Sequence, residues 1–249
     1  MSSQMSTDTR PTATAPADPA DEERFEAMVP GARSLVRRVV RPLLRTWLRL
    51  EVEGLEHLPA DGPVLIASTH CSHADSLALG AGTHRPVFFL GDERLTRWPL
   101  LGPLLPRLGM VPVQRGRGDR RALDLLGGLL ADGHAVVVYP EGSRSRDGRV
   151  HRPRSGVARL AAATGVPVVP VAVAGIFEVW PIGRRPRLRG GRVVVRFGAP
   201  IEPPVDHPRE RRRFNERLHA TLADLAGVEA ADDYSPVGGG TGAGDEVAA

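Results

Sequence analysis

The chain has 249 residues, of which 41% are hydrophobic and 25% are charged, and its formal net charge at pH 7 is +4. This length and composition fit one sizeable α/β domain and exclude a chain that is disordered throughout. Aromatic residues make up only 4% of the chain and the net charge is modest, so nucleic-acid binding is not expected.

Both ends of the chain are expected to be disordered. Residues 1–21 are mainly Ser, Thr, Ala, Pro and Asp, and residues 229–249 are rich in glycine, so neither segment can bury much apolar surface. The start lacks the pattern of a secretory signal, and no run of about 18 apolar residues predicts a membrane span. A single cysteine, Cys71, cannot form an internal disulfide, which fits a cytoplasmic protein.

The first predicted element is a basic amphipathic helix within residues 22–50. In its segment RSLVRRVVRPLLRTWLRL (33–50), arginine recurs every fourth residue and apolar pairs recur in step between the arginines. Such helices lie in the interface of membranes that contain anionic lipid. The alternative is a helix packed on its own domain with a solvated face, but a merely solvated face usually mixes both charge signs. We therefore expect peripheral binding to the inner face of the cell membrane.

Strand-like and helical patterns alternate over residues 51–228, which we treat as one domain. Most predicted strands are continuously apolar, as strands buried on both faces are: 50–52, 63–68, 87–90, 110–113, 135–139, 166–173 and 192–197. Helices are predicted between several of them, and again near the end of the domain, at 75–81, 119–131, 155–163 and 208–227. This alternation predicts an α/β fold with a mixed, largely parallel sheet flanked by helices.

The segment STHCSHADSL (68–77) concentrates side chains that could carry chemistry at the turn from a predicted strand to a predicted helix. His70 and Asp75 could form a general base and its orienting carboxylate, which fixes the tautomer and leaves the other ring nitrogen to take a proton from a hydroxyl. Three alternatives stay open. Cys71 could be a nucleophile, His70, Cys71, His73 and Asp75 could hold a metal, or the His and Asp could be only a helix cap and surface polar groups.

The same His-Asp spacing recurs at His219 and Asp224, which provides an internal comparison. Those two residues fall inside the last predicted helix, where five residues turn the chain through about 500° and leave the side chains about 140° apart. At His70 and Asp75 the chain instead leaves a strand and enters a helix, so a turn can bring the carboxylate to the imidazole. Geometry therefore favours the first pair.

Two further predicted strand ends carry arginine-rich loops. The loop PEGSRSRDG (140–148) follows one strand, and QRGRG (114–118) follows another. Arginine is suited to charge-assisted, bidentate contacts with phosphate. Three strand ends thus combine a base and its orienter with arginine loops, which favours a phosphate-bearing substrate held beside a general base. Solvated basic loops are the alternative.

These blocks resemble, in the same order, those of the 1-acylglycerol-3-phosphate acyltransferases, the lysophospholipid acyltransferase family. THCSHAD resembles the family's N-H-x-S-x-x-D, with Thr69 in place of the usual Asn, and GMVPVQRG resembles G-x-I-F-I-x-R. YPEGSRSRDG resembles F-P-E-G-T-R-S-R, and GVPVVPVAV resembles a block around V-P-V. The resemblance covers about residues 50–200. It implies a glycerolipid acyltransferase-like fold, with 51–228 as the catalytic domain.

The resemblance also implies an activity and roles for particular residues. His70 would be the general base and Asp75 its orienter, and the substrate-binding residues would be Arg115, Glu141, Gly142, Ser143 and Arg144, with the arginines on the phosphate. A fatty acyl group would move from acyl-acyl carrier protein or acyl-coenzyme A to the sn-2 hydroxyl of lysophosphatidic acid or a related lysophospholipid. The product would be phosphatidic acid, with no acyl-enzyme, cofactor or metal required. A catalytically silent membrane-binding module of the same fold, and a hydrolase that uses the same pair on water, are the other functions considered.

Overall fold

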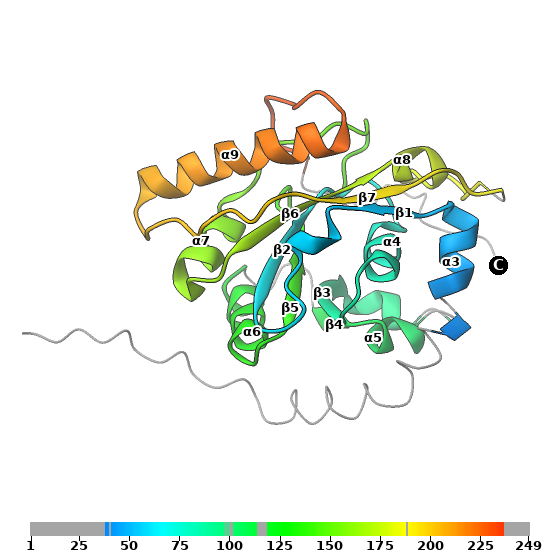
Figure 1. The fold of residues 1–249 in the computed structure, drawn as a ribbon, viewed down its shortest axis with the longest axis horizontal. Helices are drawn as coiled ribbons and strands as arrows, with labels where there is room; N and C mark the ends of the chain where they lie inside the picture. Colours follow the sequence, from blue (N-terminus) through cyan, green and yellow to red (C-terminus); the bar gives the residue numbers. More distant parts are fainter. Residues whose placement is uncertain are drawn as a thin grey trace, which may run out of the picture.

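A computed structural model describes residues 38–39, 41–97, 99, 102–113, 119–187 and 189–236. Its centre is a seven-stranded sheet in the order β1-β7-β6-β2-β5-β3-β4 (Figure 1). All neighbouring strands pair in parallel except β6 and β7, which are antiparallel. The strands are β1 (Glu51–Glu53), β2 (Val64–Ser68), β3 (Val87–Asp92), β4 (Met110–Val113), β5 (Ala135–Val138), β6 (Val168–Ala174) and β7 (Val194–Phe197).

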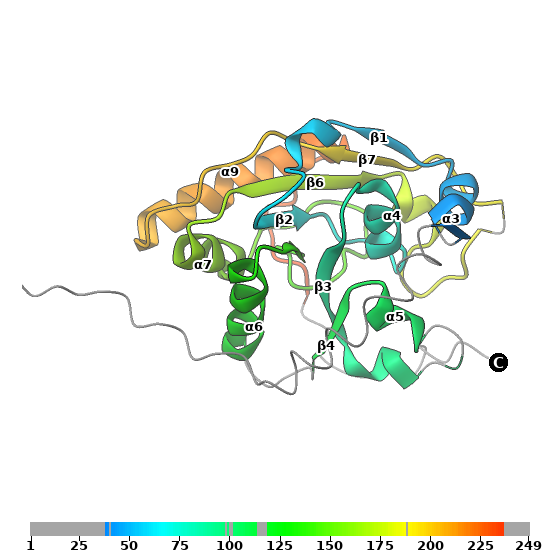
Figure 2. The same cartoon turned by 60° about the horizontal axis from the view of Figure 1, so that its bottom comes forward.

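Helices cover both faces of the sheet (Figures 1 and 2). The helices α6 (Asp119–Ala131), α7 (Ser155–Thr164) and α9 (Pro208–Ala226) lie on one face. The other face is covered by α3 (Arg41–Leu48), α4 (Asp75–Gly82) and α5 (Leu104–Arg107), and the short α8 (Ile176–Val179) follows β6. Two short 3-10 helices, η2 (Leu55–His57) and η3 (Glu93–Arg97), complete the described elements.

The central strands read as continuous apolar runs because they bury side chains on both faces of the sheet. In β2, Val64 and Ile66 join the core under α4, whereas Leu65 and Ala67 join the core under α6, α7 and α9. All five residues of β2 are buried. The fold class predicted from the sequence is therefore confirmed, and each strand and helix predicted over residues 51–228 is present with bounds within a few residues.

The parallel pairing of β2 with β5 fixes where the polar loops lie. Val64 pairs with Ala135 and Ala67 with Val138, so the two strands end at the same level. The turn at residues 69–75 and the loop at residues 139–154 therefore emerge side by side at one edge of the sheet. This edge holds the candidate site.

The N-terminal amphipathic segment is described only in part, since residues 22–37 and 40 lie outside the described residues. Within α3, Leu48 is buried against the domain. Arg41 and Arg45 both donate through Nε to the carbonyl oxygen of Ala81, at 2.8 and 3.2 Å, at the end of α4. These arginines therefore satisfy carbonyls at a helix C-terminus. Among the described residues, no helix combines the length and apolar character needed to cross a bilayer.

Residues 229–236 differ from the disorder that their composition suggested. Ala231 and Ser235 are buried, and the backbone N–H of Ala231 donates to the carbonyl oxygen of Val150 at 2.8 Å. We call residues 230–236 the C-terminal segment. Its order comes from contacts with the loop after β5, whose residues are distant in sequence. The predicted tail at 1–21 and residues 237–249 lie outside the described residues.

Candidate active site

His70 and Asp75 meet in the turn between β2 and α4. Nδ1 of His70 lies 2.8 Å from Oδ2 of Asp75, and the same oxygen accepts the backbone N–H groups of Cys71 and Ser72, each at 2.8 Å. Asp75 is the first residue of α4 and is only 1% exposed. Because the carboxylate oxygen accepts, Nδ1 carries the proton and Nε2 is the nitrogen that can take a proton from a substrate.

Residues of the loop after β5 hold His70 in place. Its imidazole stacks on Tyr139 with 3.8 Å between ring centroids and 17° between planes, and the Tyr139 hydroxyl is hydrogen-bonded to Ser76 of α4. The backbone of His70 donates to Oε1 of Glu141 at 3.2 Å and accepts from the N–H of Ser145 at 2.7 Å. Both the ring and the main chain of His70 are thus positioned by the neighbouring loop.

Glu141 is a buried carboxylate that joins two backbone segments. Oε1 accepts from His70, and Oε2 accepts from the backbone N–H of His151 at 3.2 Å. Its side chain is 1% exposed, and burial raises the pKa of Glu141 to about 7, although these two backbone hydrogen bonds oppose the shift. Glu141 therefore acts on the site through the main chain that it holds.

Gly142 lets an arginine pack beneath the loop. Its φ of +73° is a left-handed conformation, and a Cβ at this position would lie 2.7 Å from Cδ of Arg154. Nε of Arg154 donates to the carbonyl oxygen of Glu141 at 3.1 Å, and Nη2 donates to that of Ser235 at 2.9 Å. Arg154 therefore connects the loop to the C-terminal segment.

The remaining substrate-binding residues predicted from the sequence have different surroundings. Arg144 is half-buried, and its Nη1 lies 3.0 Å from Nδ1 of His73, which brings the guanidinium beside the turn that holds His70 and Asp75. The hydroxyl of Ser143 donates to that of Ser235 at 2.9 Å. Arg115 falls in the segment 114–118, outside the described residues.

Sequence reasoning missed a polar network centred on His151. This histidine is 5% exposed; its Nδ1 lies 2.9 Å from Oδ1 of Asp233, and its Nε2 lies 3.1 Å from Oδ1 of Asp147. The same oxygen of Asp147 accepts the hydroxyl hydrogen of Ser145 at 2.8 Å. Burial alone would lower the pKa of His151, but its hydrogen bonds to the two aspartates raise that pKa above the ordinary value. The imidazolium form can donate to both carboxylates.

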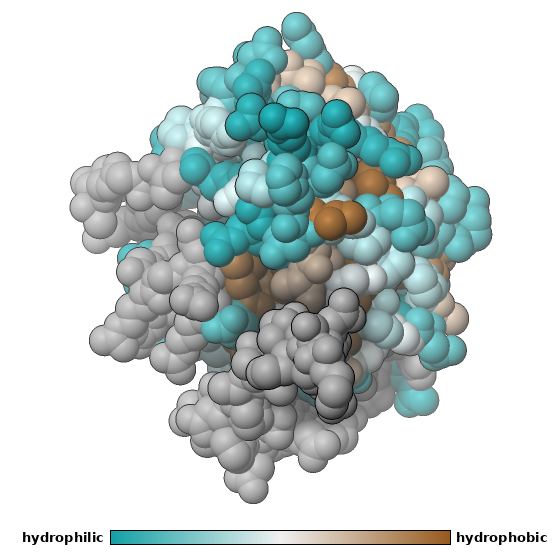
Figure 3. All heavy atoms as spheres, turned by 90° about the vertical axis from the view of Figure 1, so that its left-hand side faces the viewer, coloured by the Kyte–Doolittle hydropathy of each residue, from teal (hydrophilic) through white to brown (hydrophobic). Residues whose placement is uncertain are grey.

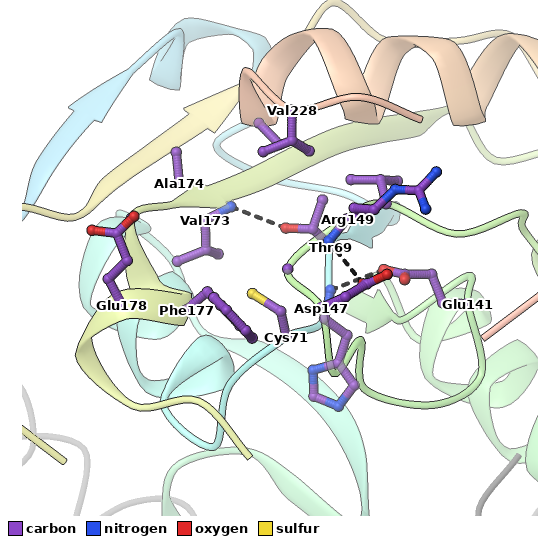
Figure 4. A pocket seen from close by; sticks show the side chains of 15 residues that line it. Thr69, Cys71, Glu141, Asp147, Arg149, Val173, Ala174, Phe177, Glu178 and Val228 are labelled. Carbon is purple, nitrogen blue, oxygen red and sulfur yellow. Dashed lines mark hydrogen bonds between the residues drawn. The ribbon is translucent and has the colours of Figure 1, made fainter. Parts of the chain in front are cut away.

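The two chemical alternatives at this turn find little support in the structure. Burial, together with the charges of Asp75 and Glu141, raises the pKa of the Cys71 thiol far above its ordinary value, which disfavours the thiolate that a nucleophile needs. Its sulfur points between Val173 and Phe177 in a pocket of about 240 Å³ (Figure 4). In the described part of the chain, no group of three or more His, Cys, Asp or Glu residues is placed to hold a metal ion.

The second His-Asp pair has another environment. His219 lies within α9, and its Nε2 donates to the carbonyl oxygen of Val150 at 2.9 Å. This histidine therefore anchors the helix to the end of the loop after β5. The expected difference between the two pairs is present: the carboxylate of Asp75 contacts an imidazole, and His219 contacts a backbone carbonyl.

Comparisons with known proteins agree on one family for this chain. A family model described as Acyltransferase matches residues 49–174, which include the His70–Asp75 turn and the loop after β5. The chain is 34% identical over 159 residues to a chloroplastic 1-acyl-sn-glycerol-3-phosphate acyltransferase of Arabidopsis thaliana, covering 62% of this chain and 44% of that protein. It is 29% identical over 191 residues to the 1-acyl-sn-glycerol-3-phosphate acyltransferase of Pseudomonas aeruginosa, covering 73% of this chain and 72% of that protein.

A solved structure supports the same grouping. The crystal structure of the 1-acyl-sn-glycerophosphate (LPA) acyltransferase PlsC from Thermotoga maritima matches with a TM-score of 0.59 and 27% sequence identity. The match covers 83% of this chain and 87% of that one. By contrast, the chain spans less than half the length of the chloroplast relatives that it matches.

Proposed function

Because the chain belongs to the acyltransferase family, we propose that it transfers a fatty acyl group to the sn-2 hydroxyl of lysophosphatidic acid or a related lysophospholipid, giving phosphatidic acid. The donor is a thioester, acyl-acyl carrier protein or acyl-coenzyme A. The observation that carries this proposal is the 2.8 Å contact between His70 Nδ1 and the buried Asp75 carboxylate. The plant, bacterial and crystallised relatives are 1-acyl-sn-glycerol-3-phosphate acyltransferases, which supports the choice of acceptor.

In the proposed mechanism His70 acts as the general base. Its Nε2 takes the proton of the substrate hydroxyl as the hydroxyl oxygen attacks the thioester carbonyl. The Asp75 carboxylate stabilises the imidazolium that forms and holds its orientation. When the carbon–sulfur bond breaks, the imidazolium returns the proton to the leaving thiolate. The acyl group passes directly to the acceptor, so the enzyme forms no covalent intermediate.

We propose that the acceptor's phosphate is held by arginine. Arg144 is the described candidate, because its contact with His73 places a permanent positive charge beside the His70 turn. Arg115 is the second candidate on the strength of its sequence block. In this proposal Glu141, Gly142 and Ser143 contribute by shaping the loop that carries Arg144, through the hydrogen bonds and the close packing described above.

Product analysis distinguishes the proposal from its two rivals. Purified protein is incubated with vesicles, a panel of lysophospholipids and each type of donor, and the products are identified by mass spectrometry. The proposal predicts phosphatidic acid from lysophosphatidic acid together with free thiol. Free fatty acid with no acylated lipid would indicate a hydrolase, and unchanged substrates would indicate a silent module.

We further propose that this reaction takes place at the inner face of the cell membrane, with the protein bound peripherally from the cytoplasm. The acceptor is a lipid, and the described end of the amphipathic segment exposes apolar side chains. Val39 is 54% exposed and Leu43 is 67% exposed. Exposed apolar side chains on a basic helix are typical of interfacial binding.

A further inference from the structure

The loop between α8 and β7 carries a dense positive charge that the proposed reaction does not use. Its sequence IGRRPRLRGGR (182–192) contains no acidic residue. Arg192 is paired with Glu51 at 2.8 Å, whereas the side chains nearer the middle of the loop are exposed: Arg184, Arg185, Arg187 and Arg189. We call residues 182–191 the arginine loop.

The arginine loop begins at the catalytic turn. The hydroxyl of Ser72 donates to the carbonyl oxygen of Trp180 at 2.7 Å, and Ser72 also forms an isolated antiparallel bridge with Pro181. The rings of His73 and Trp180 lie 5.5 Å apart. The loop is therefore tied to the turn that holds the candidate catalytic pair.

The other end of the loop rests on α3. Nε1 of Trp47 donates to the carbonyl oxygen of Arg187 at 3.2 Å, and the backbone N–H of Val193 donates to that of Leu48 at 3.0 Å. Gly190 has a φ of +61°, and a Cβ there would collide with the backbone of Trp47, so the loop approaches the helix more closely than another residue would allow. Figures 1 and 2 both show the loop beside α3 at the right-hand end of the molecule.

Together, the loop and the outer face of α3 combine charge with exposed apolar side chains. Four exposed residues lie in or next to this helix: Arg38 and Val39 before its first residue, Leu43 within it and Arg49 just after its last residue. Arginines next to exposed aliphatic side chains suit the boundary between lipid headgroups and acyl chains, where anionic lipid attracts the charges and the acyl region takes up the apolar groups. An acidic protein would satisfy the charges but would not by itself account for Leu43.

We propose that the arginine loop and the outer face of α3 form one docking surface for an anionic phospholipid bilayer. Because the loop runs from the catalytic turn to α3, bilayer contact along it places the edge of the His70 site against the lipid surface. A lysophospholipid could then reach the base without leaving the interface. The last step rests on the proposed function, whereas bilayer binding through the loop does not.

The test compares two variants with the same change in net charge. In the first, Arg184, Arg185, Arg187 and Arg189 are replaced by Gln. In the control, Gln replaces exposed arginines of α9: Arg209, Arg212, Arg213 and Arg217. The N-terminal half of α9 lies at the opposite end of the molecule (Figure 1), and the upper part of that end shows mainly hydrophilic side chains (Figure 3). Co-sedimentation with phosphatidylcholine vesicles, with and without phosphatidylglycerol, gives the affinity at low and raised salt.

We expect the loop variant to bind anionic vesicles roughly 600-fold more weakly than the parent, since each of the four interfacial arginines contributes roughly fivefold. The affinity of the α9 variant for the same vesicles should stay within about threefold of the parent's. The double variant Arg184→Gln/Arg185→Gln should bind anionic vesicles about 25-fold more weakly than the parent. It replaces the quadruple variant in the test if that variant does not fold. Equal losses in the loop and α9 variants, or no loss in the loop variants, would overturn the proposal.

Turnover separates this proposal from the proposed function. With a short-chain lysophosphatidic acid in neutral detergent, the loop variant should keep the parent's rate, because no anionic surface is present. If the parent shows no transfer at all but the vesicle results hold, the proposed function fails and the docking surface stands. If vesicle binding is unchanged and only the KM for an acyl carrier protein donor rises, the surface binds an acidic protein and the proposal is wrong.

Discussion

Nδ1 of His151 lies 2.9 Å from Oδ1 of Asp233, although the two residues are 82 positions apart in the chain. This contact ties the C-terminal segment to the loop that also supports His70. Through Asp147 and Ser145, the same network reaches the carbonyl oxygen of His70. The C-terminal segment is therefore connected to the candidate base through hydrogen bonds, not only through the core.

Two adjacent aspartates test this connection. Asp233→Ala leaves the buried His151 without one of its acceptors and should cost about 0.5–1.5 kcal/mol in the free energy of unfolding, because the lost bond is charge-assisted but partly exposed. Asp232 is fully exposed and pairs with Arg152 at 3.3 Å, so Asp232→Ala should leave that free energy close to the parent's. Urea unfolding at pH 6 compares the variants, and equal costs would show that the His151 contact is not the stabilising one.

Stability should fall as pH rises through the range in which Glu141 and His151 titrate. Glu141 has a pKa of about 7 when folded and an ordinary value of 4.5, so the folded state binds more protons between these values. The free energy of unfolding should therefore decrease between pH 4.5 and 7, by up to about 3 kcal/mol. The raised pKa of His151 adds a further decrease as pH rises above 6.5.

The variant Glu141→Gln isolates the contribution of the carboxyl group. It should be less stable than the parent at pH 5, because an amide offers one acceptor oxygen to the two backbone N–H groups of His70 and His151. Its stability should also change less with pH between 4.5 and 7. Urea unfolding at several pH values checks both expectations, and a variant with the parent's full pH dependence would contradict the assignment to Glu141.

Gly142 and Gly133 form a matched pair for testing the loop's packing. Both have positive φ, at +73° and +83°, so replacement by Ala should strain either backbone by about 1 kcal/mol. Only Gly142→Ala adds a Cβ that displaces Arg154, because a Cβ added at Gly133 would meet no other group within 4 Å. We expect Gly142→Ala to lower kcat/KM at least about tenfold and Gly133→Ala to leave it unchanged. Similar rates for both variants would mean that the packing under Gly142 does not matter for the site.

Arg144→Ala should raise the KM for the lysophospholipid acceptor more than the KM for the acyl donor. A charge-assisted contact with phosphate is worth about 1.5–3 kcal/mol, which corresponds to a rise of roughly 10- to 150-fold in the KM for lysophosphatidic acid. His73→Ala should raise the same KM less, because it removes a neighbour of Arg144 and leaves the guanidinium in place. Initial rates with each substrate varied in turn give both constants. A rise only in the donor KM would assign Arg144 to the other substrate.

The sequence was informative where structure depends on local pattern. Buried strands such as β2 are almost entirely apolar, which makes them recognisable in the sequence. The predicted turn from strand to helix after β2 also allowed Asp75 to be identified as the partner of His70, five residues earlier. The same reasoning missed His151 and Asp233, since no local pattern shows that a glycine-rich C-terminal region folds back onto a loop. Periodicity also did not reveal that Arg41 and Arg45 contact the end of α4, because that contact depends on tertiary packing.

The central claim is that His70, oriented by Asp75, is the general base, and turnover of matched histidine and aspartate variants tests it most directly. On folded, vesicle-bound protein with lysophosphatidic acid, His70→Ala should reduce the initial rate roughly 10²- to 10⁴-fold. Asp75→Asn should also cut it strongly, because an amide does not fix the required tautomer. His219→Ala and Asp224→Asn share the spacing but lie in α9, and they should stay within a few-fold of the parent. A His70→Ala enzyme with a near-normal rate, or a His219→Ala enzyme as inactive as His70→Ala, would contradict the account.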